Sequence, residues 1–197
     1  MKKILSLMIC LLIIPGLVLA AETKAVVKTS TNLAENAKSA IMIEASSGKV
    51  LFDKNSHEKL PPASMTKMMS MLLIVEAVED GIISWDQKIT VSENASGMGG
   101  SQILLETGEQ MSVDDLFKGV AIMSGNDAVV ALAEAVAGTE DEFVKMMNKR
   151  AKELGLKDSV FKNPHGLDDA NHYSSAYDMS LIAKELVKHD RLSLIHI

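Results

Sequence analysis

The stretch PPASMTKMMSMLLIVEAVEDG, residues 61–81, decides the fold of this chain. Its two prolines end any preceding strand, because proline has no N–H group to donate to a strand ladder. From Ser64 to Glu79, apolar residues fall on almost every face of a helix, which is typical of a helix buried on all sides. Asp80-Gly81 then provides a helix end. We therefore predict a buried central helix over residues 64–79, against which the other elements pack.

Two strand-like runs precede this helix, AIMIE at 40–44 and KVLFD at 49–53. The residues Ser46-Ser47-Gly48 lie between them and are typical of a turn, so the pattern predicts a β-hairpin. A two-stranded hairpin is not stable by itself, and no strand-rich segment follows in the sequence. We therefore predict an α+β fold in which this hairpin begins an antiparallel sheet whose later strands are missing from the chain.

Helical patterns follow a polar, glycine-rich stretch at 92–101. Ser112, Thr139 and Ser175 each stand where a side chain can cap the first turn of a helix. The helices predicted from the apolar spacing cover residues 116–123, 127–136, 140–154 and 176–188. Together these segments predict a helical cluster that accompanies the hairpin.

The composition limits the class of protein. The 197 residues are 47% hydrophobic and 4% aromatic, which suits one packed domain and excludes a disordered tail or a collagen-like chain. The chain has 20 Lys and Arg against 26 Asp and Glu, a net charge of −6, without a basic cluster. Nucleic acid is therefore not an expected partner, because phosphate binding needs concentrated positive charge. The single cysteine, Cys10, cannot form an intramolecular disulfide.

The N-terminus has the three parts of an export signal. A basic start precedes an apolar run over residues 4–19, and the small residues at 20–21 follow it. A retained membrane anchor is the alternative, although the run is short for a membrane span, which needs about 20 residues. We predict a signal peptide over residues 1–20 and a flexible lead-in over 21–37. The protein is then exported to the cell wall or the outer face of the cytoplasmic membrane.

Ser64 and Lys67 are the first candidates for chemistry. Residues three apart at the start of a helix share one face, with Cβ atoms about 5–6 Å apart. A buried helix removes water from the lysine and lowers its pKa, and a neutral amine can accept the serine proton. The alternative is that Ser64 caps the helix and Lys67 is solvated. The S-x-x-K pattern alone favours that alternative, because both residues are common.

Ser124-Gly125-Asn126 is the second candidate. A loop between two helical segments can present the Ser124 hydroxyl and the Asn126 amide to a cleft on short side chains. The alternative is that Gly125 interrupts one helix and Asn126 caps the next, and the tripeptide alone favours this simpler interpretation.

The two motifs together are more specific than either alone. S-x-x-K, an S-D-N-type element and K-S/T-G are the active-site motifs of penicillin-binding proteins and class A β-lactamases, and the first two occur here in that order. From Ala40 to about Val187 the sequence resembles the serine D-alanyl-D-alanine carboxypeptidases, the low-molecular-mass penicillin-binding proteins of bacterial walls. The matching stretches are GKVL at 48–51, PASMTK at 62–67, SGNDA at 124–128, MN at 147–148, AKELGL at 151–156 and NPHGL at 163–167.

The resemblance implies the front part of a penicillin-binding-protein/β-lactamase-like transpeptidase fold. It implies roles for the matched residues only. Ser64 would be the acyl-enzyme nucleophile, its backbone N–H one oxyanion-hole donor, and Lys67 its general base. Ser124 would help to relay the proton to the leaving group, and Asn126 would hydrogen-bond the substrate backbone. The implied partners are peptidoglycan stem peptides that end in D-Ala-D-Ala, and β-lactam antibiotics, which would acylate the same serine. No cofactor or metal is implied.

The chain departs from the family pattern in one respect. It contains no K-S/T-G motif. Lys118-Gly119 is similar, but it lacks the Ser or Thr that the motif has between Lys and Gly. We therefore expect a C-terminally truncated chain, with a partial catalytic domain over residues 38–190 and an atypical end over 191–197 that is a candidate for non-native sequence. These residues alone are expected to be inactive, and any membrane attachment would depend on the missing C-terminus.

Four other functions compete with this one. His165, Asp168, Asp169 and His172 crowd into one loop and suggest zinc, but no third ligand stands at helical spacing. A class A β-lactamase would carry an E-x-x-L-N loop after the second motif, which the sequence lacks. A D,D-endopeptidase stays open, because cleft shape and not motif separates it from a carboxypeptidase. A non-catalytic wall-binding module also stays open, and would bind D-Ala-D-Ala peptides without releasing D-Ala.

Overall fold

The computed structural model describes residues 33–195, and from Ala34 onward the chain forms one compact unit. The predicted signal peptide over residues 1–20 and most of the predicted lead-in over 21–37 lie outside the described residues. The boundaries proposed for the catalytic domain, 38–190, stay predictions. None of the helices described here combines the length and the apolar character needed to span a bilayer.

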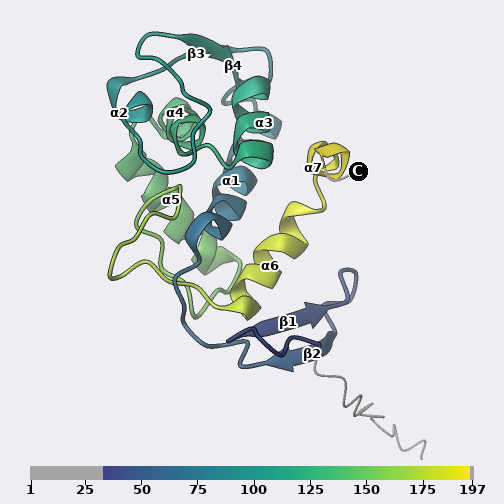
Figure 1. The fold of residues 1–197 in the computed structure, drawn as a ribbon. Coiled ribbons are helices and arrows are strands. Elements are labelled where there is room, and N and C mark those ends of the chain that lie inside the picture. Colours follow the sequence, from purple (N-terminus) through teal and green to yellow (C-terminus); the bar gives the residue numbers. More distant parts are fainter. Residues whose placement is uncertain (1–32, 196–197) are drawn as a thin grey trace, which may run out of the picture. The chain divides into compact units, whose positions relative to one another are not determined.

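The described chain contains two hairpins and a set of helices (Figure 1), so the predicted α+β class is confirmed. Its strands are β1 (Ala40–Ile43), β2 (Val50–Lys54), β3 (Lys88–Thr90) and β4 (Gln110–Ser112). Its helices are the 3-10 turn η1 (Ala63–Thr66), α1 (Lys67–Glu79), α2 (Glu93–Ser96), α3 (Val113–Met123), α4 (Asn126–Ala137), α5 (Glu140–Glu153), α6 (Ala176–Leu186) and α7 (Asp190–Ile195).

The predicted first hairpin is confirmed, with β1 and β2 paired antiparallel. Its turn depends on Glu44, whose carboxylate accepts hydrogen bonds from the backbone N–H groups of Ser46 and Ser47 at 3.1 and 2.7 Å. Gly48 follows with φ +73°, a left-handed conformation that glycine adopts without strain because it has no Cβ. The turn residues in the sequence therefore fix this hairpin locally.

No strand-rich segment follows the first hairpin in the described residues, as expected, but the structure has a second, short hairpin that the sequence did not predict. β3 and β4 pair antiparallel, with Ile89 opposite Met111, and form a second two-stranded sheet. Each of these strands has three residues, and the segment between them contains α2 instead of a tight turn. A strand pair without a local turn and without a long alternating pattern gives no signal in the sequence.

The central helix predicted from residues 64–79 is confirmed, although its first turn is 3-10 and α1 begins only at Lys67. The side chains of Met69, Leu72 and Ile74 are 0% exposed, and α3, α4, α5 and α6 all contact this helix. Figure 1 shows α1 running through the middle of the helical body. The core of the described chain is therefore organised around α1, and residues at its start are held in place from several sides.

The later helices begin where the sequence predicts. Ser112, Thr139 and Ser175 each accept a hydrogen bond from the N–H group three residues further on, which caps α3, α5 and α6. Arg150 of α5 makes an ion pair with Glu76 of α1, with 2.6 Å between nitrogen and oxygen. The helical cluster is thus fixed by local caps and by contacts to the central helix.

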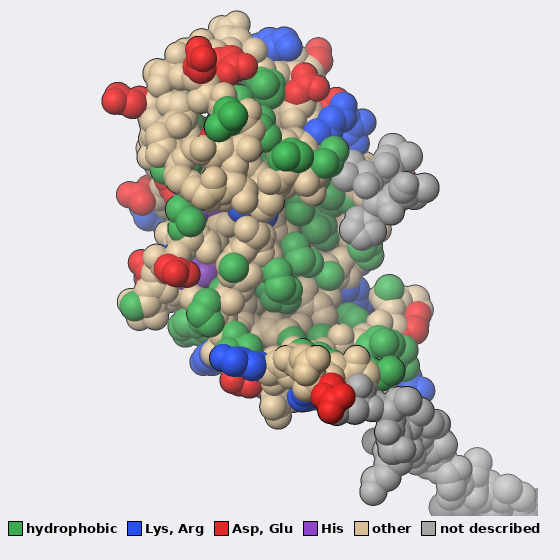
Figure 2. All heavy atoms as spheres, in the orientation of Figure 1, with side chains coloured by type: hydrophobic (Ala, Val, Ile, Leu, Met, Phe, Trp, Pro, Cys, Tyr) green, Lys and Arg blue, Asp and Glu red, His purple; other side chains and the backbone are tan. Residues whose placement is uncertain are grey.

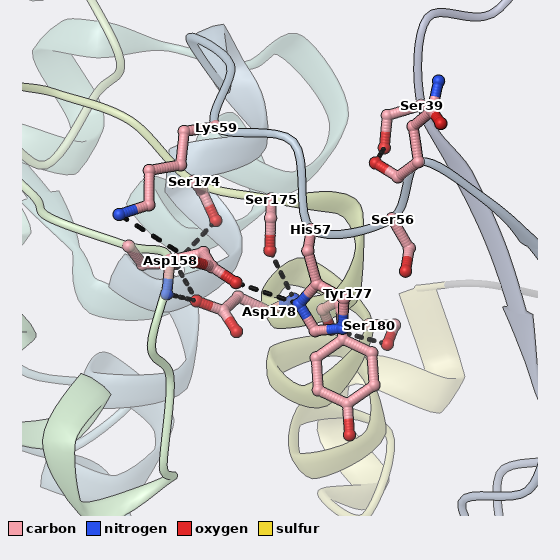
Figure 3. A network of polar contacts seen from close by, with 12 residues as sticks. Ser39, Ser56, His57, Lys59, Asp158, Ser174, Ser175, Tyr177, Asp178 and Ser180 are labelled. Carbon is pink, nitrogen blue, oxygen red and sulfur yellow. Dashed lines mark hydrogen bonds and ion pairs between the residues drawn. The ribbon is translucent and has the colours of Figure 1, made fainter.

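A polar network fastens the segment between β2 and η1 to the start of α6 (Figure 3). His57 Nδ1 lies 2.9 Å from a carboxylate oxygen of Asp158, and Lys59 makes a 3.8 Å ion pair with the same side chain. Asp178, which is 1% exposed, accepts the backbone N–H of Asp158 at 2.7 Å. The exposed ion pairs add little stability. The buried Asp178 bond, however, fixes the backbone at Asp158, the partner of His57, against α6.

Hydrophobic side chains are also exposed on one face of the molecule, between the helical body and the β1–β2 hairpin (Figure 2). Met42 and Leu51 of the hairpin are 48% and 55% exposed, and Val187, just after α6, is 60% exposed. These side chains do not belong to the core around α1. These side chains of the hairpin are thus left partly uncovered in the described fold.

Candidate active site

Ser64 and Lys67 lie together at the start of the central helix. Ser64 is exposed on η1, whereas Lys67 is only 2% exposed. The Lys67 Nζ atom lies 3.4 Å from Ser64 Oγ, a long hydrogen bond of the kind common in sites without a bound substrate. Burial lowers the pKa of Lys67 to about 8, because loss of water penalises the ammonium form. A hydroxyl therefore stands beside an amine that is partly unprotonated near neutral pH.

The simpler interpretation of this pair is wrong. Neither η1 nor α1 has a side-chain hydrogen bond at its N-cap, so Ser64 does not cap the helix. Lys67 is buried and not solvated. Within the described residues, the hydrogen-bond partner of the Ser64 hydroxyl is the Lys67 amine.

The loop over residues 163–167 packs on this pair. Lys67 Nζ donates a hydrogen bond to the backbone oxygen of His165 at 2.8 Å. One turn further along α1, the Ser70 hydroxyl donates to the backbone oxygen of Pro164 at 2.6 Å. Two consecutive carbonyl groups of the loop are therefore bonded to two consecutive turns of the helix.

Gly166 brings the same loop against η1. Its φ is +90°, and a Cβ at this position would overlap the backbone carbonyl of Ala63. The side chain of Asn163 closes the loop, since its Oδ1 accepts the N–H of Gly166 at 2.6 Å and its Nδ2 donates to Leu167 at 2.9 Å. A cavity of about 330 Å³ opens beside this contact, lined by residues 61–63, 166–170 and His172. The glycine is thus required by close packing beside the candidate nucleophile.

The imidazole of His165 is held between two partners. Its Nδ1 accepts the backbone N–H of Leu167 at 3.1 Å, so the neutral ring carries its proton on Nε2. Nε2 lies 3.4 Å from a carboxylate oxygen of Glu140. This hydrogen bond lowers the pKa of Glu140, which stays ionised. His165 therefore contacts Lys67 through its backbone and Glu140 through its ring.

His172 is also fixed by protein groups. Its Nε2 lies 2.8 Å from the Thr66 hydroxyl, and its Nδ1 accepts the N–H of Lys162 at 3.3 Å. Burial lowers the pKa of His172, which favours the neutral ring. Among residues 33–192, no three His, Cys, Asp or Glu side chains are grouped as a metal site would require. The zinc interpretation of this loop therefore gains no geometric support.

Ser124 lies at the junction of α3 and α4, as the sequence predicts. Its backbone is left-handed, with φ 57° and ψ 34°, a conformation that residues with a Cβ adopt rarely and often at functional sites. Its hydroxyl oxygen is buried and has no hydrogen-bond partner in the described part of the chain. Since buried hydroxyl groups are nearly always paired, this one is available to a group that enters the site.

Asn126 is the first residue of α4 and is 4% exposed. Its side chain does not cap the helix, so the simpler interpretation of this residue is wrong. Asn126 Nδ2 instead donates to the backbone oxygen of Gly99 at 2.7 Å. A Cβ on Gly100 would lie 2.8 Å from that same nitrogen and 3.6 Å from Cδ2 of Leu167. Asn126 and the 163–167 loop therefore border the same glycine.

The structure thus brings Ser64 and Lys67 into direct contact. The second motif lies on helices that pack against the same central helix. No hydrogen bond within the described chain joins Ser64 or Lys67 to Ser124 or Asn126. The connection runs through α1, which contacts both α3 and α4.

Asp127, Gly166 and Glu140 are site residues to which the sequence analysis assigned no role. The buried Asp127 carboxylate accepts the backbone N–H groups of Ile103 and Leu105, each at 3.1 Å, and so holds the loop that covers Asn126. The sequence could have marked Asp127 and Gly166 as candidates, because they lie in the family-matching stretches SGNDA and NPHGL. No local signal marked Glu140, since its partner is distant in sequence.

An exposed serine beside a buried lysine, at the start of the central helix of an α+β fold, is the S-x-x-K arrangement of penicillin-binding proteins and class A β-lactamases. The chain belongs to the D-alanyl-D-alanine carboxypeptidase family, because the model of that family matches residues 25–197. The D-alanyl-D-alanine carboxypeptidase DacF of Bacillus subtilis is 53% identical over 193 residues, which is 98% of this chain and 50% of DacF. The chain therefore spans half the length of that relative.

Two solved structures extend the comparison. Penicillin binding protein 5 from Haemophilus influenzae matches with a TM-score of 0.75 and 40% identity, covering 77% of this chain and 45% of that protein. A penicillin-binding protein from Listeria monocytogenes, solved in its ampicillin-bound form, matches with a TM-score of 0.68 and 29% identity, covering 77% and 62%. The predicted family and the penicillin-binding-protein fold are confirmed.

Proposed function

We propose that the natural protein is a serine D,D-carboxypeptidase that removes the terminal D-Ala from peptidoglycan stem peptides. The observation that carries this proposal is the Ser64–Lys67 pair, with 3.4 Å between Oγ and Nζ and a lysine pKa lowered to about 8. Lowering the pKa from 10.5 to about 8 raises the neutral fraction of the amine at pH 7 roughly 300-fold. A base is therefore present where the nucleophile needs one.

The reaction proceeds through an ester on Ser64. The neutral Lys67 amine takes the hydroxyl proton while Ser64 Oγ attacks the carbonyl carbon of the D-Ala–D-Ala bond. The carbon–nitrogen bond then breaks, and the leaving D-Ala amine receives a proton. Water next hydrolyses the ester, which frees the shortened peptide and restores Ser64. The backbone N–H of Ser64 is proposed as one oxyanion-hole donor for both steps.

We propose that Ser124 acts on the leaving group and that Asn126 binds the substrate. The Ser124 hydroxyl, buried and without a partner in the described chain, suits a relay of the proton between Lys67 and the leaving amine. The Asn126 side chain lies beside the same region and would hydrogen-bond the substrate backbone. No step of this scheme calls for a cofactor or a metal.

β-Lactams are proposed as ligands of the same serine. A β-lactam presents a strained amide to Ser64 in place of the D-Ala–D-Ala bond, and the ester that forms is the analogue of the acyl-enzyme. The ampicillin-bound form of the Listeria monocytogenes relative supports this class of ligand. Nucleic acid is not proposed as a partner, because the net charge is −6.

An extracytoplasmic location is proposed from the predicted signal peptide over residues 1–20. A substrate in the cell wall is reached only after export, so the location and the proposed reaction agree. Attachment to the outer face of the membrane stays a prediction.

The decisive experiment treats the complete natural protein with fluorescent penicillin and, separately, with a D-Ala-D-Ala peptide. The parent should bind one label per molecule and release D-Ala, whereas Ser64→Ala should do neither. Ser84→Ala is the matched control, because Ser84 is also exposed but hydrogen-bonds only surface groups such as Asp86. Labelling of Ser64→Ala at the parent level would contradict the proposal, and peptide binding without D-Ala release would favour the wall-binding module.

A further inference from the structure

We propose that His165 and Glu140 are positioning residues that hold Lys67 in the geometry needed for acylation. This inference rests on the proposed function of Ser64 and Lys67. The two residues come from different elements, since Glu140 begins α5 and His165 lies in the 163–167 loop. Among the described residues, no hydrogen bond or ion pair joins either side chain to Ser64, so we infer that both act through Lys67.

Lys67 needs such support because a lysine side chain is long and flexible. Its Nζ has two hydrogen-bond partners in the described chain, the Ser64 hydroxyl at 3.4 Å and the backbone oxygen of His165 at 2.8 Å. A neutral amine has two N–H groups and one lone pair. When one N–H is given to His165, rotation of the amine is restricted and its lone pair can face Ser64. The carbonyl of His165 therefore sets the direction in which Lys67 accepts a proton.

The carbonyl can do this only if the loop backbone is fixed at residue 165, and the imidazole fixes it. The His165 side chain is 8% exposed, its Nδ1 accepts the N–H of Leu167 at 3.1 Å, and its Nε2 faces Glu140 at 3.4 Å. A rotation of the peptide at this position would break both ring contacts. The Ser70–Pro164 bond on the preceding carbonyl limits the loop from the other side.

Glu140 is itself a fixed acceptor. Its other carboxylate oxygen accepts Asn94 Nδ2 at 3.2 Å, and the same amide donates to Glu134 at 2.9 Å. Glu140 lies in the first turn of α5, where the helix N-terminus favours a negative charge. The chain of contacts therefore runs from Asn94 through Glu140 and His165 to Lys67.

The test measures the rate constant of penicillin acylation in the complete natural protein, together with the affinity of the non-covalent complex that precedes it. Glu140→Ala should slow acylation about tenfold and leave the pre-covalent affinity unchanged. Glu140→Gln should stay within about threefold of the parent, because its amide oxygen still accepts the His165 N–H. Glu134→Ala is the matched control, since Glu134 shares Asn94 but does not contact His165, and it should acylate at the parent rate.

A purely structural role would give a different pattern. Loss of folded protein lowers the amount of label at saturation and not the rate constant per labelled site. A parent rate in Glu140→Ala, or an equal loss in Glu140→Gln and Glu140→Ala, would overturn the proposal. If Glu140→Ala does not fold, Asn94→Ala replaces it, with an expected two- to threefold slowing, and a parent rate there would also overturn it.

The same experiment separates this inference from the function on which it rests. If neither the parent nor Ser64→Ala is labelled by penicillin, the proposed function fails. If the parent is labelled at Ser64 and Glu140→Ala keeps its rate, the function stands and the positioning role of Glu140 and His165 is wrong.

Discussion

The two motifs of the candidate site differ in how completely the protein satisfies their polar groups. At the start of α1, the Lys67 amine is bonded both to Ser64 and to the backbone of His165. At the α3–α4 junction, the oxygen of the Ser124 hydroxyl is buried but has no partner within the described residues. Both residues lie at helix ends, and both are held by buried surroundings.

The difference suggests different roles for the two motifs, one as the base and the other as a proton relay. A base that must be neutral and correctly directed profits from fixed contacts before the substrate arrives, because its geometry is then already set. A hydroxyl that relays a proton must exchange partners during the reaction, and a fixed partner would hinder it. Substitutions at the two motifs should therefore separate effects on stability from effects on rate.

Lys67→Arg should give the largest effect. Arginine keeps the positive charge but does not deprotonate in proteins, so no base is left for Ser64. We expect a loss of about 10³-fold in the rate of penicillin acylation, within the range found for general bases. Stopped-flow or gel-based labelling of the complete natural protein measures this rate, and circular dichroism checks that the variant is folded. Acylation at the parent rate would show that Lys67 is not the base.

Gly166→Ala should give the next largest effect, on stability. A Cβ at Gly166 would overlap the carbonyl of Ala63 at φ +90°, so the loop must move away from η1. We expect a loss of about 3 kcal/mol in the free energy of unfolding, from steric overlap and left-handed strain together. Denaturant titration measures it.

Gly138→Ala is the control for this substitution. Gly138 has a similar φ of +86°, but a Cβ there would meet nothing within 4 Å. It should cost only the strain of a left-handed residue, about 1–2 kcal/mol. Equal losses in the two variants would mean that the contact between the 163–167 loop and η1 is not tight.

The regions of the fold that the sequence could predict are those fixed by local contacts. The first hairpin follows from Ser46, Ser47 and Gly48, which bond and turn within a few residues. The starts of α3, α5 and α6 follow from capping residues that bond three positions further on. The apolar pattern of residues 64–79 likewise predicts the buried central helix.

The rest depends on pairs of residues that are distant in sequence. The burial that lowers the pKa of Lys67 involves the 163–167 loop, about a hundred residues away, and the S-x-x-K pattern contains no trace of it. The contact between Glu140 and His165 also joins separate elements, and β3 pairs with β4 without a tight turn. The family resemblance therefore named the candidate residues, and the predicted burial of the helix implied a lowered lysine pKa. The loop contacts that support Lys67 required the structure.

Ser124→Ala should lower the rate and not the stability. Loss of a proton relay should slow acylation about 10²-fold, at the lower end of acid–base effects. Removing a buried hydroxyl without a partner should leave the free energy of unfolding unchanged or raise it by up to about 1 kcal/mol. Ser70→Ala is the contrast, because it loses the bond to Pro164 and should cost about 1 kcal/mol. Thermal unfolding and acylation rates measured on both variants check this, and a destabilised Ser124→Ala would show that the hydroxyl is paired after all.

The smallest effect is the pH dependence of acylation. Burial lowers the pKa of Lys67 to about 8, and only the neutral amine accepts the Ser64 proton, so the rate should rise with pH. The neutral fraction grows from about 0.09 at pH 7 to about 0.9 at pH 9, which predicts a rise of about tenfold with a midpoint near pH 8. The pKa values of Glu140 and His172 are both lowered from ordinary values that already lie below pH 7, so neither group titrates in this window. The rate is measured with fluorescent penicillin at constant ionic strength. A flat rate between pH 7 and 9 would mean that the proton of Ser64 goes to another group. Lys67 would then not be the base, and its contrast with Ser124 would have no bearing on catalysis.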